Sequence, residues 1–236
     1  MSVGGRRLEG RVIAVAGAGG ALGPIVVRAL SDEGARVAAC DRDEDALEPL
    51  RGIAADVRPA DLSTPEGAVA WRDGAFNALG DVHGLVHLVG GWRGGAPLHE
   101  APLEDLDLLE LLLFRTVAHT TRAFAADVQA AGERGRFALV SAAQAQRPSA
   151  GNAAYAAMKA AAEAWTLTFA QELRESCATA NVVVINALVT PQMRAENPDK
   201  AYRTFTDAEE IAEALVFLCS DAARKMTGQR LPLHGG

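Results

Sequence analysis

Short runs of apolar residues alternate along this chain with longer segments in which apolar positions recur at helical spacing. Solid apolar runs separated by helices predict a parallel β-sheet covered by helices on both faces. The expected strands are 11–16, 35–40, a weak one within 52–60, 82–89, 136–141, 181–189 and 229–233. The expected helices are 21–33, a short acidic one from 43, 65–79, 103–131, 152–175 and 207–220.

This order of elements indicates the α/β class, because right-handed crossovers between parallel strands give a Rossmann-like, doubly wound parallel sheet, here of about seven strands. The sequence contains no internal repeat, low-complexity tract or linker, so we expect residues 1–236 to form a single domain. The segment 192–206 is the most polar and irregular, and we expect it to be a mobile loop.

A glycine-rich segment, Gly17–Gly23, lies between the first expected strand and the first expected helix. Such a turn brings backbone N–H groups and the positive end of a helix dipole together, where they bind a pyrophosphate. Side chains would block that approach, so glycine is the required residue type. The predicted dinucleotide site comprises Gly17, Gly19, Gly20, Ala21, Leu22 and Gly23. A tight turn without a ligand is the alternative.

Asp41 ends the second expected strand. A carboxylate there accepts hydrogen bonds from both ribose hydroxyls of adenosine and repels a 2′-phosphate, which favours NADH over NADPH. Arg42 follows directly and favours a phosphate, and the alternative role for Asp41 is the N-cap of the next helix. Asp61 and Leu62 follow the weak third strand, where they contact the adenine or Asp61 merely starts a turn.

Tyr155 and Lys159 lie four residues apart within a helical pattern, so their side chains share one face. A nearby ammonium favours phenolate and is expected to lower the pKa of Tyr155 from about 10 toward neutrality. The pair therefore predicts a proton donor for the reduction of C=O or C=N, with Lys159 also holding a ribose hydroxyl. A surface pair on an amphipathic helix is the alternative. His87, inside a buried strand pattern, is interpreted as a core residue rather than a base.

Composition and charge exclude several classes of protein. Apolar residues make up 49% of the chain and charged residues 22%, unlike disordered, collagen-like or disulfide-stapled chains. The net charge of −7 argues against nucleic acid as a partner, because phosphate contacts require a basic face. No segment reaches the roughly 20 apolar residues of a membrane helix. We therefore expect no membrane partner. The three cysteines are scattered, which indicates reduced thiols in a cytoplasmic protein, and the histidines form no metal-ligand spacing, so we expect no metal site.

Together these motifs resemble the short-chain dehydrogenase/reductase family over nearly the whole chain. The glycine loop, Asp41, Asp61 with Leu62, Tyr155 with Lys159, and the closing segment 226–236 follow in the family's order and spacing. The resemblance implies the strand order 3-2-1-4-5-6-7, an NAD cofactor, and a homodimer or homotetramer formed through helices 106–124 and 155–171. The leucine-rich run 106–113 suits such an interface, with a buried core helix as the alternative. Further cofactor-binding residues implied by the resemblance are Val89, Gly90, Gly91, Val189 and Thr190.

Two members of the family's usual Asn–Ser–Tyr–Lys tetrad are missing. The serine position, thirteen residues before the tyrosine, is Ala142, and the asparagine position is Leu113. Ser141 is a poor substitute, because neighbouring strand residues face opposite sides of a sheet. Half of the usual proton-transfer machinery is therefore absent.

These departures resemble one branch of the family, the dihydropteridine reductases, which also lack the serine. The Gly17–Gly23 loop and the segment 90–95, with the sequence GGWRGG, are similar to segments of that branch. The expected substrate contacts are Trp92, Ala142, Gln144 and Met193. Trp92 either stacks on a flat heterocycle or packs as a lid residue on the next loop.

We therefore predict an enzyme, an NADH-dependent reductase of a small, flat substrate of the imine or quinonoid type. An activated C=N or quinonoid group needs less polarisation than a ketone, which accounts for the missing serine. Tyr155 and Lys159 are the expected catalytic residues. The alternatives are an NAD-binding protein of the same fold that acts as a sensor, or one that catalyses a non-redox cyclisation or isomerisation.

Overall fold

The computed structural model describes residues 5–234, so Gly235 and Gly236 of the closing segment lie outside the described residues. Its main sheet has seven parallel strands in the order β3-β2-β1-β4-β5-β6-β9, which confirms the expected topology. In that order the strands are Asp56–Pro59, Arg36–Asp41, Val12–Ala16, Gly84–His87, Arg136–Ala142, Thr179–Ile185 and Arg230–Pro232.

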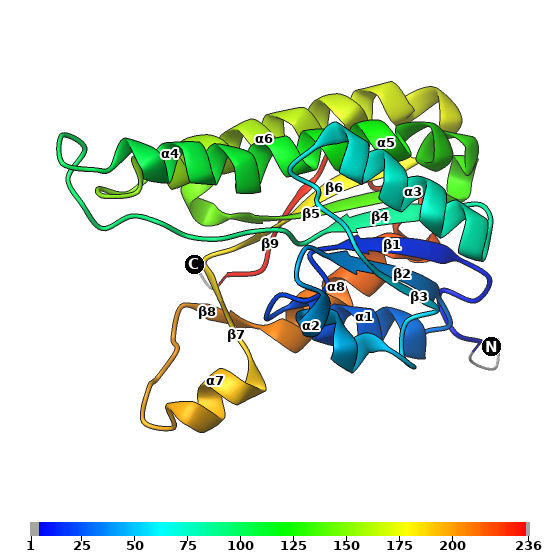
Figure 1. Ribbon diagram of the computed structural model, residues 1–236, viewed down its shortest axis with the longest axis horizontal. Coiled ribbons are helices and arrows are strands. Elements are labelled where there is room, and N and C mark those ends of the chain that lie inside the picture. Colours follow the sequence, from blue (N-terminus) through cyan, green and yellow to red (C-terminus); the bar gives the residue numbers. More distant parts are fainter. Residues whose placement is uncertain (1–4, 235–236) are drawn as a thin grey trace.

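Helices cover both faces of this sheet (Figure 1). One face carries α1 (Gly23–Asp32), α2 (Glu44–Leu47) and α8 (Ala208–Cys219); the other carries α3 (Pro65–Leu79), α5 (Thr116–Ala130) and α6 (Ala153–Glu172). Because side chains alternate along a strand, each strand contributes to two separate cores. In β1, Ile13 and Val15 pack with α1 and α8, whereas Val12 and Ala14 pack with α3, α5 and α6.

Local sequence signals explain where the helices begin and end. Thr64 caps α3, since its Oγ1 accepts a hydrogen bond from the Gly67 N–H at 3.1 Å, and Pro65 follows at the first helical position. Gly80 ends the helix with a φ of +79°, a conformation that glycine adopts without a steric penalty. None of the helices described for residues 5–234 is long and apolar enough to cross a membrane.

Two elements differ from the sequence-based expectation. The helix expected over 103–131 is divided into α4 (Leu103–Glu110), a π-helical segment (Leu111–Arg115) and α5. The Thr116 hydroxyl donates to the Leu112 carbonyl at 2.7 Å, at the point where regular α-helical geometry resumes. The segment keeps the helix continuous and changes which side chains face the sheet.

The strand expected over 181–189 also divides, at Asn186. After β6 the chain leaves the main sheet, and β7 (Ala187–Val189) pairs with β8 (Phe205–Asp207) in a separate parallel pair. Between these strands lies α7 (Pro191–Glu196), so the segment expected to be an irregular loop contains a helix. The result is a small lobe beside the carboxyl end of the sheet (Figure 1).

Candidate functional site

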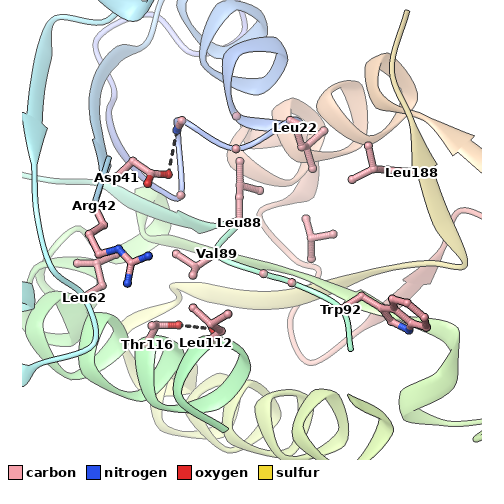
Figure 2. Close-up of a pocket in the computed structure, with 18 of the residues that line it drawn as sticks. Leu22, Asp41, Arg42, Leu62, Leu88, Val89, Trp92, Leu112, Thr116 and Leu188 are labelled. Atoms are coloured by element: carbon pink, nitrogen blue, oxygen red, sulfur yellow. Dashed lines mark hydrogen bonds between the residues drawn. The ribbon is translucent and has the colours of Figure 1, made fainter. Parts of the chain in front are cut away.

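A cavity of about 910 Å³ opens at the carboxyl ends of the central strands, where open α/β sheets bind ligands (Figure 2). Most residues that the sequence indicated are brought together on its wall. These are Gly17, Gly19, Gly20, Ala21, Leu22, Gly23, Asp41, Arg42, Asp61, Leu62, Val89, Gly90, Gly91, Trp92, Gln144, Tyr155 and Lys159.

The glycine loop connects β1 to the start of α1 and lies directly against the end of β4. A Cβ on Gly17, whose φ is +79°, would lie 2.6 Å from the Val89 nitrogen, and one on Gly23 would lie 2.1 Å from the Ala18 oxygen. Any side chain at these positions would displace backbone. The loop therefore presents bare backbone at the amino end of α1, which fits the pyrophosphate of a dinucleotide.

Asp41 holds the glycine loop against the end of β2. Its Oδ2 accepts a hydrogen bond from the Gly19 N–H at 3.1 Å (Figure 2). Its Oδ1 accepts one from the Asp43 N–H at 3.2 Å. Asp43, not Asp41, is the N-cap of α2, because its side chain accepts from Asp45 and Ala46. The alternative role of Asp41 as a helix cap is therefore wrong, and its carboxylate lies on the cavity wall.

Arg42 and Asp61 lie on the same side of the cavity as Asp41. Asp61 does start a turn, since its Oδ1 accepts from the Ser63 N–H at 3.0 Å, and it also lines the cavity. Hydrogen bonding with Ser63 lowers the pKa of Asp61, with a smaller contribution from Arg42. The Arg42 side chain extends beside Leu62 in Figure 2. The Arg42 cation and the carboxylates of Asp41 and Asp61 thus lie on the cavity wall.

Tyr155 and Lys159 project from one face of α6 into the cavity. Lys159 is buried, and its Nζ donates to the Val140 carbonyl at 3.0 Å. Burial lowers the pKa of Lys159 to about 8. Burial also raises the pKa of Tyr155, so the expectation that Lys159 brings this pKa toward neutrality is not met. Tyr155 is consequently a protonated phenol at neutral pH, the form that gives a proton to a reduced substrate.

His87 is a core residue, as interpreted from the sequence. It is fully buried, and its Nε2 and Nδ1 lie 3.2 Å and 3.1 Å from the hydroxyl oxygens of Thr116 and Thr120. Burial lowers the pKa of His87 to about 3, with a further contribution from the charge of Lys159. The ring is therefore neutral at physiological pH.

The end of β5 differs from the expectation. Ser141 lines the cavity and Ala142 does not. Phe137 and Leu139 belong to the core on the α6 side, so Ser141 shares that side and Ala142 faces the other. The two residues thus face opposite sides of the sheet, as expected, but Ala142, the expected substrate contact, is not on the cavity wall. The Ser141 Oγ is nevertheless enclosed and has no hydrogen-bond partner among the described residues, so its hydroxyl is not presented to the cavity. Leu113, at the asparagine position, is also buried.

Three further expected contacts, Val189, Thr190 and Met193, are absent from the cavity wall. The chain leaves the main sheet at Asn186, and β7 pairs with β8 so that Ala187 and Leu188 reach the cavity wall but Val189 does not. Val189 is buried within the lobe, and Thr190 caps α7 by accepting from the Met193 N–H at 3.2 Å. Asn186 and Leu188 line the cavity in their place.

Sequence reasoning missed several lining residues that carry no motif. They are Asp43, Ala46, Ala60, Ser63, Leu88, Leu111, Leu112, Thr116, Val140, Ser141, Ile185, Asn186, Ala187 and Leu188. Six of them are apolar residues in or directly after strands, and their only signal is adjacency to a predicted residue: Ala60, Leu88, Val140, Ile185, Ala187 and Leu188. Leu112 and Thr116 share a helix face at a spacing of four residues, but the sequence does not reveal the π-helical segment that sets this face.

The GGWRGG segment is tied to the loop that precedes α6. The Trp92 indole donates to the Asn152 Oδ1 at 3.0 Å, and the Gly95 N–H donates to the Gly151 carbonyl at 2.8 Å. Trp92 lines the cavity while 54% of its surface remains exposed. Of the two roles considered, the geometry matches the lid residue that packs on a neighbouring loop. Within residues 5–234, no three His, Cys, Asp or Glu side chains cluster in a manner suited to a metal ion.

Comparisons with known proteins agree with this geometry. The model of a family described as "Enoyl-(Acyl carrier protein) reductase" matches residues 17–236. A 2,3-dihydroxy-2,3-dihydro-p-cumate dehydrogenase of Pseudomonas putida is 31% identical over 97% of this chain and 95% of its own length.

Two solved structures have closely similar folds. An NAD⁺-bound xylitol dehydrogenase has a TM-score of 0.87 at 23% identity, over 98% of this chain and 100% of that one. A blue fluorescent protein from a metagenomic library, in complex with NADPH, has a TM-score of 0.86 at 25% identity, over 98% of both chains.

Proposed function

Because this chain belongs to the short-chain dehydrogenase/reductase family of oxidoreductases, we propose that it is an NADH-dependent reductase of a small, flat substrate with an activated C=N or quinonoid group. The main support is one cavity that the Gly17–Gly23 loop, Tyr155 and Lys159 line together. This arrangement brings an anion-binding loop and a proton donor within the reach of one extended cofactor. The bound nicotinamide supplies the hydride.

A nicotinamide cofactor is also supported by the two structural neighbours, one bound to NAD⁺ and one to NADPH. We propose NADH because the Asp41 carboxylate lies beside the glycine loop. There it would accept hydrogen bonds from the ribose hydroxyls and repel a 2′-phosphate. Arg42, whose side chain is exposed, opposes this preference in part. Asp61, Leu62, Val89, Gly90 and Gly91 complete the proposed cofactor wall.

In this proposal Tyr155 gives the proton and Lys159 orients the nicotinamide ribose. The raised pKa of Tyr155 keeps its phenol protonated, and the pKa of about 8 at Lys159 keeps most of its ammonium charged at pH 7. Ala142 and Leu113 contribute no hydrogen-bonding side chain, and the Ser141 hydroxyl is enclosed. A substrate that is already electrophilic needs no such side chain.

The apolar part of the cavity wall also supports a flat, uncharged substrate. Leu111, Leu112 and Leu188 line it together with Trp92, and Gln144 supplies a polar group. These features resemble a dihydropteridine reductase, which is the substrate type we propose. The named relatives are dehydrogenases and reductases, which does not favour the non-redox alternative.

The test is NADH oxidation at 340 nm with quinonoid dihydropterin, beside a panel of imines, quinones and simple ketones. Turnover of dihydropterin or imines with little turnover of ketones is the expected result. Fast reduction of plain ketones with no activity on the activated substrates would overturn the substrate class. Tight NADH binding with no oxidation on any substrate would remove the reductase assignment.

We further propose that two or four copies associate through α5 and α6. A small groove of about 140 Å³ between these helices is lined by Thr121, Trp165 and Phe169 among others. The Trp165 indole donates to the Thr121 hydroxyl at 2.8 Å, which fixes the ring at this surface. Light scattering on the purified protein measures the copy number directly, and a monomer at micromolar concentration would refute the proposal.

A further inference from the structure

A buried carboxylate lies one helical turn beyond Lys159. Glu163 is only 1% exposed, and residues four apart share one helix face, so Tyr155, Lys159 and Glu163 follow one another along α6. Glu163 does not line the cavity and has no part in the function proposed above. A carboxylate is rarely buried to this extent without a partner of opposite charge.

The two oxygens of Glu163 have different surroundings. Oε2 accepts from the Arg230 Nε of β9 at 2.6 Å and from the Gln146 Nε2 at 3.1 Å. Oε1 is equally enclosed and has no partner among the described residues. Arg230 thus engages one carboxylate oxygen through a single nitrogen. A guanidinium that bonds both oxygens through two nitrogens would be a stronger anchor. One buried oxygen remains available for a second positive group.

Lys159 lies one turn away on the same helix face and forms no ion pair with Glu163 within 4.0 Å, so the two charges interact without a direct hydrogen bond. An ammonium has three N–H donors, and in the described residues only the bond to the Val140 carbonyl uses one of them. The other titratable groups around Lys159 are Tyr155 on α6, a protonated phenol, and His87 on β4, a neutral ring. The negative charge nearest along this face is Glu163, whose other neighbour is Arg230 of β9.

We propose that Glu163 is a positioning residue that keeps Lys159 charged in its buried site, so that the ammonium is available to orient the cofactor ribose beside Tyr155. This inference rests on the proposed function for its purpose, but not for its test. Burial lowers the pKa of Lys159, whereas the charge of Glu163 raises it. Without Glu163 a smaller fraction of Lys159 would be charged at neutral pH.

The chain allows a direct measurement, because its lysines are Lys159, Lys200 and Lys225 and the last two are exposed. The Cε resonances of ¹³C-lysine-labelled protein are followed against pH, and Lys159 is assigned by the signal lost in Lys159→Arg. In the wild type we expect Lys159 to titrate near 8. In Glu163→Gln we expect its midpoint to fall by about 1 pH unit, the typical effect of losing a nearby opposite charge. Glu172→Gln, at the exposed end of the same helix, is the matched control and should leave the midpoint unchanged.

Two more variants separate the charge effect from a merely structural role. Arg230→Met removes the anchor to β9 but leaves the carboxylate, so the Lys159 midpoint should not fall. Glu163→Asp keeps the negative charge, so the Lys159 titration midpoint should lie close to its wild-type value. An unchanged midpoint in Glu163→Gln, or an equal fall in Arg230→Met, would overturn the inference.

The pH dependence of turnover provides the functional readout. Turnover that needs the charged ammonium decreases above the pKa of Lys159, so the alkaline limb should move to lower pH in Glu163→Gln by the same amount as the resonance. The resonance is measured without any substrate. A shifted resonance in a protein that oxidises no NADH would retain the role of Glu163 and refute the reductase, whereas an unshifted resonance in an active reductase would do the reverse.

Discussion

The two glycine-rich segments of the cavity resemble each other in sequence, but the glycines that line the cavity differ in the space around them. In Gly17–Gly23 the backbone is enclosed by other backbone: a Cβ on Gly23 would lie 2.1 Å from the Ala18 oxygen. In the GGWRGG segment a Cβ on Gly90 would meet nothing closer than the Leu88 oxygen at 3.6 Å, an ordinary contact distance. Gly94 of the second segment, which does not line the cavity, is also enclosed, since its Cβ would lie 2.8 Å from the Gly151 oxygen. The first segment requires glycine for space, and the second at Gly90 does not.

This difference divides the cavity into a fixed half and an adaptable half. The cofactor half is formed by a turn between β1 and α1 that Asp41 ties to β2. The substrate half is formed by loops held mainly by the Trp92–Asn152 and Gly95–Gly151 hydrogen bonds. The named relatives differ in the substrates that their names give, and such variation is accommodated more readily by loops than by a tightly packed turn.

The largest expected effect comes from Tyr155, which lies where the two halves meet. Tyr155→Phe removes the phenolic proton and leaves the ring, so turnover should fall by roughly 10²–10⁴-fold while NADH binding stays nearly unchanged. Initial rates at 340 nm and nicotinamide fluorescence measure the two quantities. Unchanged turnover would remove Tyr155 from proton transfer and leave the two halves without a shared catalytic group.

The next prediction contrasts the two glycine segments directly. Gly23→Ala forces its Cβ against the Ala18 carbonyl, so the loop must move, and NADH affinity should fall by about 10²-fold. Gly90→Ala is the matched variant: Gly90 also belongs to the proposed cofactor wall, but its Cβ would meet no atom of residues 5–234 closer than 3.6 Å, so affinity should change by less than about twofold. Equal losses in both variants, measured by fluorescence titration, would contradict the division of the cavity.

The fold was largely predictable because its signals are local and repeated. Apolar strands, helical spacing and the Thr64–Pro65 start signal are each read from a few adjacent residues. The cofactor half followed for the same reason, since the Gly17–Gly23 loop and Asp41 adjoin the ends of two recognisable strands. The outcome at β5 was different, because alternation places Ser141 and Ala142 on opposite sides of the sheet but does not show which of them reaches the cavity wall.

The remaining errors lie where long-range pairing overrides local pattern. Residues 181–189 read as one strand, yet the chain divides at Asn186 because β7 finds its partner in β8, eighteen residues later along the chain. That division removed Val189, Thr190 and Met193 from the predicted site. The direction of the Tyr155 pKa shift was also mispredicted. Helical spacing indicates that the Lys159 charge would lower this pKa, but it does not reveal the burial that raises it.

Cofactor preference tests the fixed half more finely. Asp41→Asn removes the charge and retains one acceptor for the Gly19 N–H, so the loop should keep its shape. Loss of the repulsion should raise the kcat/KM ratio of NADPH to NADH by about tenfold, equivalent to about 1.4 kcal/mol. A wild type that already prefers NADPH would show that Arg42 dominates and that Asp41 does not discriminate.

A smaller effect is expected in the adaptable half. Trp92→Phe retains an aromatic ring and loses the hydrogen bond to Asn152, which is worth about 1 kcal/mol, so substrate KM should rise by about threefold to tenfold with kcat nearly constant. Asn152→Ala should have a similar effect, and the double variant should add little, because both changes remove one interaction. Additive losses would show that Trp92 contacts substrate independently of Asn152.

The smallest effect on turnover is expected from His87, which is fully buried and does not line the cavity. With a pKa of about 3 the ring stays neutral, so His87→Gln should leave the pH–rate profile unchanged between about pH 5.5 and 7.5.

The substitution at His87 should instead change how the free energy of unfolding depends on pH. A histidine whose folded pKa lies below the unfolded value of 6.5 stabilises the protein fully above pH 6.5, and this contribution decreases as the pH falls toward 3. Urea unfolding at pH 7 and pH 5 should therefore show a loss of up to about 1.4 kcal/mol per pH unit in the wild type that is reduced in His87→Gln. His99→Gln, at an exposed position, should behave as the wild type. A pH–rate limb near 6.5 that disappears in His87→Gln would instead make this histidine part of the catalytic machinery.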